Sequence, residues 1–255
     1  PMGGDILKAE MGLSAGIIKS FSSLQLIACG TAYHAALVGR VLFENFGIAA
    51  HANVASEFTD RAKLLAPDTL VIAVSQSGET ADTLFAVREA KISGAKVLAI
   101  TNTVGSTLTR EADYVLYTHC GPEIGVASTK AFLGQLAAIY LLAGHFAAAR
   151  GRLPGNDARR YAGELLKIPR LIEETLGKEK EIAEVADSFA SSEHFLFISR
   201  HINYPIALEG ALKIKEISYV HAEGYAAGEM KHGPIAIIYK GMPLLAVAPS
   251  GRTLE

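Results

Sequence analysis

Short apolar runs alternate along the chain with longer segments in which apolar residues recur at helical spacing. The expected strands are 24–29, a short segment near 51–54, 69–74, 96–100 and 114–117, and helices are expected over 33–46 and 79–92. Near-continuous apolar strands need cover on both faces, so the pattern predicts a parallel sheet with helices on either side. The predicted fold class is α/β and doubly wound.

The middle of the chain is predicted to be helical. An apolar helix over 129–150 is ended by Gly151 and Pro154. Two amphipathic stretches follow, 156–176 and 178–190, and Pro169 should bend or split the first of them. These stretches predict a helical bridge between two lobes.

The opening pattern then returns. Segment 196–200 resembles 26–30, and segment 245–253 resembles 71–80 at a similar offset, which indicates duplicated lobes. The first lobe continues past its Ser-Gly motif with two further strands, so the second lobe is either unusually minimal or truncated. We expect it to be truncated in this chain. The expected division is an N-terminal helical segment 1–20, a first lobe 21–152, a bridge 153–192 and a second lobe 193–255.

Composition narrows the functional classes. Among 255 residues, 50% are hydrophobic and 20% charged, and the formal net charge is −2, which disfavours nucleic-acid and anionic-membrane binding. Two isolated cysteines, Cys29 and Cys120, argue against a disulfide framework or a thiolate metal site. The most apolar stretch, 131–149, contains Gln135 and His145 and is predicted to be a buried helix. We expect a cytoplasmic protein without a cofactor or metal.

A hydroxyl-rich motif follows the strand at 69–74 and opens a helix. It comprises Ser75, Gln76, Ser77, Gly78, Glu79 and Thr80. Amide groups at the helix start and three hydroxyls would cradle a phosphate, and the glycine would let the backbone approach it. A plain helix cap is the alternative. No Gly-x-x-x-x-Gly-Lys-Ser/Thr is present, so a nucleotide P-loop is not supported.

Two further helix starts offer hydroxyls. Thr31 follows the first strand after Gly30, and Ser128 precedes the long helix. Taken alone, the first is better explained as a glycine turn with a capping threonine, and the second as a helix cap. Several such termini within one lobe favour a shared site.

A helix in the second lobe carries charged residues on one face. Glu209, Lys213 and Glu216 are spaced i, i+4 and i+7. A solvated face with an ordinary ion pair is the commoner explanation for this spacing. The neighbouring Gly210 and Ala211 suggest a mostly buried helix instead, where a lysine–glutamate pair becomes a candidate acid–base site.

One histidine stands out by its position. His232 precedes Gly233 and Pro234 in a polar loop that begins at Gly228. Loops carry catalytic groups disproportionately, although most loop histidines are ordinary surface residues. The other histidines show no metal-ligand spacing, so a metal site is not supported.

Taken together, these segments resemble the isomerase part of the glucosamine-6-phosphate synthase family, also called glutamine–fructose-6-phosphate aminotransferases. The matching runs are 29–31, 75–83, 125–131, 207–217 and 223–234. The combination is highly specific, whereas Ser-x-Ser-Gly alone would indicate only the wider sugar-isomerase (SIS) superfamily.

The resemblance implies two sugar-isomerase lobes, a homodimer and a hexose 6-phosphate substrate. Fructose 6-phosphate and ammonia would be converted towards glucosamine 6-phosphate by proton transfer between C1 and C2. By analogy, Ser75, Gln76, Ser77 and Thr80 would hold the phosphate, and Thr31, Val126 and Ser128 would line the sugar. Glu216 would shuttle the proton, Lys213 would assist near the anomeric end, and His232 from the neighbouring subunit would open the ring.

The chain also departs from the family pattern. Nothing in it corresponds to the family's glutaminase domain or to its C-terminal tail, so glutamine cannot be the nitrogen source of this chain alone. Ala32 stands where the bacterial pattern usually has serine, which puts one sugar contact in doubt. A non-catalytic sugar-phosphate sensor is the main alternative, and an enzyme acting on a different amino sugar is a third.

Overall fold

The computed structural model describes residues 11–250, which form two compact units. The first unit ends at Ala162 and the second begins at Gly163. Helix α2 (Ala15–Ser20) belongs to the expected N-terminal segment. Residues 1–10 of that segment, and residues 251–255 of the expected second lobe and of its repeat, lie outside the described residues.

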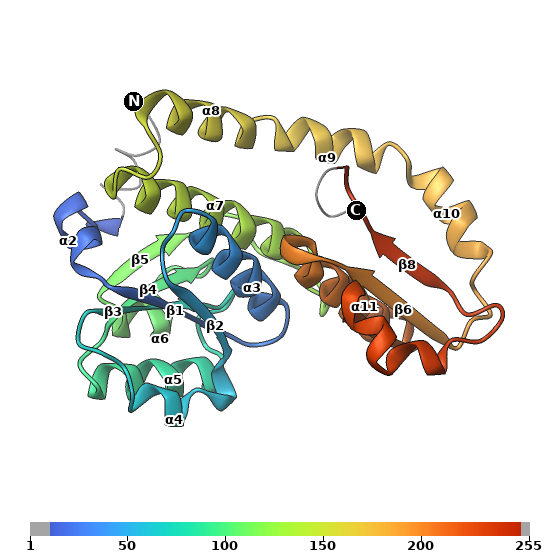
Figure 1. Cartoon of the computed structure of the whole chain (residues 1–255), viewed down its shortest axis with the longest axis horizontal. Helices are drawn as coiled ribbons and strands as arrows, with labels where there is room; N and C mark the ends of the chain where they lie inside the picture. Colours follow the sequence, from blue (N-terminus) through green and yellow to red (C-terminus); the bar gives the residue numbers. More distant parts are fainter. Residues whose placement is uncertain (1–10, 251–255) are drawn as a thin grey trace. The chain divides into compact units, whose positions relative to one another are not determined.

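Unit 1 is built on a five-stranded parallel sheet with the order β2-β1-β3-β4-β5 (Figure 1). The strands are β1 (Ser23–Ala28), β2 (Ala50–Val54), β3 (Thr69–Val74), β4 (Lys96–Thr101) and β5 (Tyr114–Tyr117). All the expected strands of this lobe are present, and the α/β class is confirmed.

Helices cover both faces of this sheet, which explains the continuous apolar strands (Figure 1). They are α3 (Gly30–Asn45) and α7 (Lys130–Ala149) on one face, and α4 (Thr59–Ala62), α5 (Ala81–Ile92) and α6 (Thr107–Glu111) on the other, with the 3₁₀ turn η1 (Ala55–Glu57). Every residue of β3 is buried. Ile27, Val71 and Val97 lie in one core cluster with the buried apolar residues of α5.

The helix α7 is long and apolar enough to cross a membrane by length and composition. Just over half of its apolar 18-residue stretch is nevertheless buried in the structure. It packs along α3, where Phe146 meets Phe43 edge-to-face with ring centroids 5.7 Å apart. Such burial is typical of a core helix, as expected for 131–149.

Three helices follow α7 in the sequence: α8 (Gly155–Leu165), α9 (Ile168–Leu176) and α10 (Glu179–Asp187). Pro169 lies in the first turn of α9, where it needs no amide partner, so the expected split of segment 156–176 is confirmed. None of the three helices contains a buried residue. The four-part division of the chain stays a prediction.

Unit 2 contains a smaller parallel sheet with the order β7-β6-β8. Its elements are β6 (His194–Ser199), η2 (His201–Asn203), α11 (Tyr204–Ser218), β7 (His221–Ala226) and β8 (Leu244–Val247). Strand β6 lies between β7 and β8 as β1 lies between β2 and β3, which confirms the predicted repeat. Segment 228–234, expected as a loop, instead lies in 3₁₀ turns, η3 (Ala227–His232) and η4 (Pro234–Ile237).

Two glycines, which have no side chain, let α11 lie close to its sheet. A Cβ at Gly210 would come within 2.8 Å of the Phe197 ring, and one at Gly224 within 2.9 Å of the Leu208 Cα. Small residues also fill the core of this unit, where Ala207, Ala211 and Ala222 surround Phe197. The two glycines therefore set the distance between α11 and the strands.

Replacing Gly224 with alanine should destabilise unit 2. The new methyl would press on backbone atoms of α11, which cannot move aside, at a cost of about 1–3 kcal/mol. Faster hydrogen exchange in β6, β7 and α11 would report the loss. Gly163→Ala is the matched control, because no heavy atom lies within 4 Å of its Cβ position. Equal exchange in the two variants would contradict the packing argument.

Candidate functional site

A cavity of about 180 Å³ opens in unit 1 at the carboxyl ends of β1 and β3. In the order β2-β1-β3-β4-β5 these neighbouring strands are followed by helices on opposite faces, α3 and α5. Ligands of open α/β sheets bind at this kind of switch point. The cavity is lined by Cys29, Thr31, Ala32, Val74, Ser75, Gln76, Ser77, Thr80, Ser128 and Gln135.

The loop from Ser75 to Thr80 forms one wall of the cavity. Ser75 Oγ accepts the Gly78 N–H at 3.1 Å and lies 3.1 Å from Thr80 Oγ1, and Ser77 Oγ accepts the Glu79 N–H at 3.2 Å. Gly78 has φ +68°, and a Cβ there would collide with the side chain of Ser106. The loop therefore needs glycine at this position.

Backbone hydrogen bonds fix this loop to its neighbours. Ser75 N–H donates to the Ile100 carbonyl, and the Gln76 carbonyl accepts the Asn102 N–H, each at 3.0 Å. The Gly78 carbonyl accepts the Leu108 N–H from α6, also at 3.0 Å. Because the hydroxyls stand on an anchored backbone, they are held in place before any ligand arrives.

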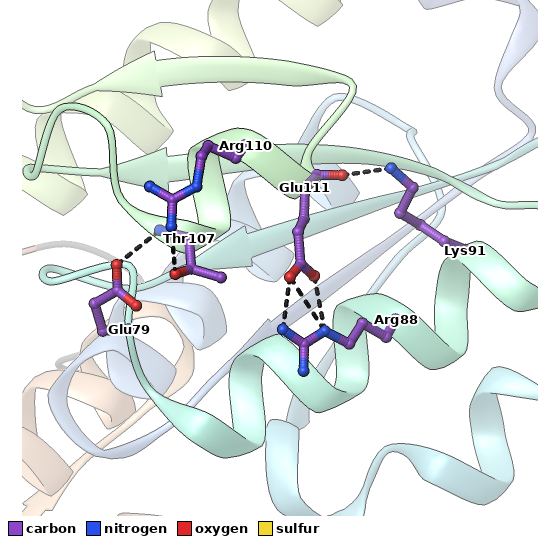
Figure 2. A network of polar contacts seen from close by, with 6 residues as sticks. All are labelled: Glu79, Arg88, Lys91, Thr107, Arg110 and Glu111. Atoms are coloured by element: carbon purple, nitrogen blue, oxygen red, sulfur yellow. Dashed lines mark hydrogen bonds and ion pairs between the residues drawn. The ribbon is translucent and has the colours of Figure 1, made fainter.

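A polar network holds the same loop from its far end (Figure 2). Glu79 Oε1 accepts the Thr107 N–H at 2.7 Å, and Arg110 donates to Thr107 Oγ1 at 2.9 Å. The hydrogen bonds from Thr107 lower the pKa of the Glu79 carboxyl from its ordinary value. Arg88 binds Glu111 through two nitrogens, at 2.6 Å for the closest pair, and so ties α5 to α6.

Two helices start at the cavity with no side-chain cap. Cys29 is the N-cap of α3 and Thr80 that of α5, and neither side chain bonds the first turn of its helix. The positive end of a helix dipole and its first amide groups favour an anion. Together with the hydroxyls of Ser75, Ser77 and Thr80, they suit a phosphate group.

The start of α7, in contrast, is closed by a carboxylate. Glu123 Oε1 accepts the N–H groups of Thr129 and Ala131 at 2.8 and 3.3 Å, and Oε2 accepts the Ser128 hydroxyl at 3.2 Å. Partial burial acts to raise the pKa of Glu123, but these hydrogen bonds outweigh it and leave the pKa below its ordinary value. Glu123 thereby holds Ser128 in the cavity wall.

In unit 2, the charged face of α11 forms an ion-pair cluster. Lys213 Nζ lies 2.5 Å from Glu216 Oε2 and 3.3 Å from Glu209 Oε1. The three side chains are only 20%, 30% and 7% exposed, respectively, so the face is not an ordinary solvated one. His232 ends η3, is exposed, and precedes Gly233 with φ +142°. Within residues 11–250, no group of three or more histidine, cysteine or acidic residues has metal-binding geometry.

A family model described as "SIS domain" matches residues 17–144 and 188–255. The chain belongs to the SIS-domain family. It is 52% identical over 253 residues to the glutamine–fructose-6-phosphate aminotransferase [isomerizing] of Methanosarcina acetivorans, covering 99% of this chain and 41% of that protein. The chain thus spans less than half the length of this relative.

Solved structures agree with this assignment. The C-terminal domain of glucosamine-fructose-6-phosphate aminotransferase from Francisella tularensis matches with a TM-score of 0.91 and 38% identity, covering 93% of this chain and 67% of that one. A phosphosugar isomerase homologue from Clostridium difficile has a TM-score of 0.86 at 22% identity, with 96% and 69% covered. The second likeness shows the fold alone.

The SIS domain brings together most of the expected binding residues. Thr31, Ser75, Gln76, Ser77, Thr80 and Ser128 all line the cavity of unit 1. Val126 does not line it and is 98% exposed. Ala32, at the position where the family resemblance implies a sugar contact, also lines the cavity, whereas sequence patterns missed Cys29, Val74 and Gln135 as lining residues. A polar residue inside the apolar stretch 131–149 was the available signal for Gln135.

Replacing Glu123 with glutamine should destabilise the SIS domain at neutral pH. Loss of the charge at a helix N-terminus costs about 1 kcal/mol, or roughly 2–4 °C in Tm for a chain of this size. The folded-state pKa is lowered, so the stabilisation is present above the unfolded pKa and is lost as pH falls through the folded pKa.

Thermal unfolding of both proteins from about pH 7 to about pH 3 tests this, because the Tm difference should shrink towards the acid end. A Tm difference that stays constant over this range would contradict the role of the Glu123 charge. Glu184→Gln, beyond the first turn of the exposed helix α10, is the control for a carboxylate away from a helix N-terminus.

Proposed function

We propose that this SIS domain binds a hexose 6-phosphate in the cavity of unit 1 and catalyses proton transfer between C1 and C2 of the sugar. The substrate would be fructose 6-phosphate, converted with ammonia towards glucosamine 6-phosphate. The carrying observation is the anchored Ser75–Thr80 loop beside the uncapped start of α5, placed at the switch point of the sheet.

The phosphate fits the loop end of the cavity on chemical grounds. Hydroxyl and amide donors suit its oxygens, and hydrogen bonds to a charged acceptor are worth about 1.5–3 kcal/mol each. Binding the phosphate away from the reacting carbons would orient the sugar without taking part in the proton transfer. Thr31 and Ser128 then remain for the sugar itself.

Aldose–ketose conversion needs a carboxylate that takes a proton from one carbon and returns it to the next. Glu216 suits this role because it is partly buried and lies beside the ammonium of Lys213. Lys213 would act near the anomeric oxygen, and His232 of a neighbouring subunit would open the ring. The homodimer, the cytoplasmic location and the role of Val126 stay predictions.

The relatives support this proposal by name. The Methanosarcina protein is an aminotransferase described as isomerizing, and the chain matches 41% of it. We propose ammonia as the nitrogen source of this SIS domain.

A non-catalytic sugar-phosphate-binding domain is the second candidate. It is favoured by the location of the whole cavity within unit 1, because ligand binding there needs no group from α11. The two functions differ in their dependence on Glu216, so they can be separated by experiment.

Ser77→Ala should weaken fructose 6-phosphate binding about ten-fold, since one hydrogen bond to the phosphate is lost. Isothermal titration calorimetry measures the affinity, and the affinity for inorganic phosphate should fall by the same factor. Ser188→Ala removes an exposed hydroxyl that donates to the Glu184 carbonyl, and it should change neither affinity. Unchanged affinity in Ser77→Ala would argue against the phosphate assignment.

Glu216→Gln should reduce deuterium incorporation at C1 and C2 of the sugar phosphate in D₂O by about 10²- to 10⁴-fold. NMR follows the exchange, and calorimetry should show fructose 6-phosphate affinity within about two-fold of the unmodified chain. Glu184→Gln, on the exposed helix α10, is the matched control. If the unmodified chain shows no exchange above that of Glu216→Gln, the non-catalytic candidate is favoured.

A further inference from the structure

Gln135 is a polar side chain buried in the wall of the unit 1 cavity. It lies on α7, is 2% exposed, and lines the cavity together with Ser128. Its Oε1 is buried and accepts no hydrogen bond from any described residue. Ala131, Phe132, Ala138 and Ile139 surround it along α7 and are buried and apolar.

An unpaired buried acceptor is costly at such a position. Leaving it without a donor costs about 1–3 kcal/mol, whereas methionine or leucine would fill the same space with no polar group to satisfy. The helix needs an apolar residue here for packing, so a glutamine that faces the cavity points to a donor supplied from the cavity.

The chemistry of the acceptor narrows the donor. A phosphate dianion has only acceptor oxygens and would be repelled by Oε1, and its own donors are the hydroxyls and amides of the Ser75–Thr80 loop. A sugar hydroxyl, in contrast, donates one hydrogen bond. Ser128, which precedes the N-cap of α7, lines the same cavity, so one ligand can contact both side chains.

We propose that Gln135 is a specificity-determining residue whose amide oxygen accepts a hydrogen bond from a hydroxyl of the bound sugar phosphate. Inorganic phosphate lacks that hydroxyl and gains nothing from Gln135. The proposal rests on the proposed hexose 6-phosphate binding and adds a residue that reads the sugar rather than the phosphate.

The test compares the unmodified chain with Gln135→Met by calorimetry. The ligands are inorganic phosphate, fructose 6-phosphate and fructose 6-phosphate analogues that each lack one hydroxyl. Gln135→Met should lower the affinity for fructose 6-phosphate about ten-fold and leave the affinity for inorganic phosphate within about two-fold of that of the unmodified chain. One deoxy analogue should bind both proteins equally, because its missing hydroxyl is the partner of Gln135.

Other results would overturn the proposal. A loss of the same size for every ligand would mean that Gln135 only supports α7, and unchanged affinity for fructose 6-phosphate would mean that it does not contact the sugar. If the unmodified chain binds no hexose 6-phosphate, the proposed function itself fails. If it binds the sugar phosphate but Gln135→Met binds it equally well, only the role of Gln135 fails.

Two further variants secure the comparison. Leu142→Met makes a similar change at a buried position of α7 that does not line the cavity, and it should alter no affinity. If Gln135→Met does not fold, Gln135→Asn keeps an amide but draws it back by one methylene. It should still weaken fructose 6-phosphate several-fold more than inorganic phosphate, and an equal loss for both would contradict the proposal.

Discussion

The site depends on the switch in strand order at β1, where β2 lies on one side of this strand and β3, also parallel to it, lies on the other. Since the helices after β1 and β3 leave towards opposite faces, the carboxyl ends of these two strands stay open between them. The loop from Ser75 to Thr80 fills one side of this opening and is fixed through Ile100, Asn102 and Leu108. The buried sheet thus provides a rigid support that holds the hydroxyl and amide donors of the loop in place.

Both units use this plan but carry different side chains on it. The orders β2-β1-β3 and β7-β6-β8 are equivalent, and α3 and α11 follow corresponding strands. In unit 1 the helix start contributes Thr31 to a cavity, whereas in unit 2 the helix carries the Lys213–Glu216 pair. Gly210 and Gly224 let α11 pack closely on the strands of unit 2.

The sequence pattern predicted those features that depend on neighbouring residues in the chain. The strand predicted at 69–74 is a nearly continuous apolar run, and β3 spans those residues. The Ser75–Thr80 motif could be recognised from its hydroxyl residues and its glycine. Strand β7 was missed because His221–Ala226 has little apolar character and needs Gly224 for the approach of α11. Gln135 could not be placed from sequence, because only the tertiary fold brings the second turn of α7 to the ends of β1 and β3.

A crystal structure of the chain with fructose 6-phosphate tests the central claim most directly. We expect phosphate oxygens within hydrogen-bonding distance of Ser75, Ser77 or Thr80 and of the first amide groups of α5, at about 2.7–3.2 Å. A sugar phosphate bound elsewhere, with the cavity between β1 and β3 left without ligand, would contradict it.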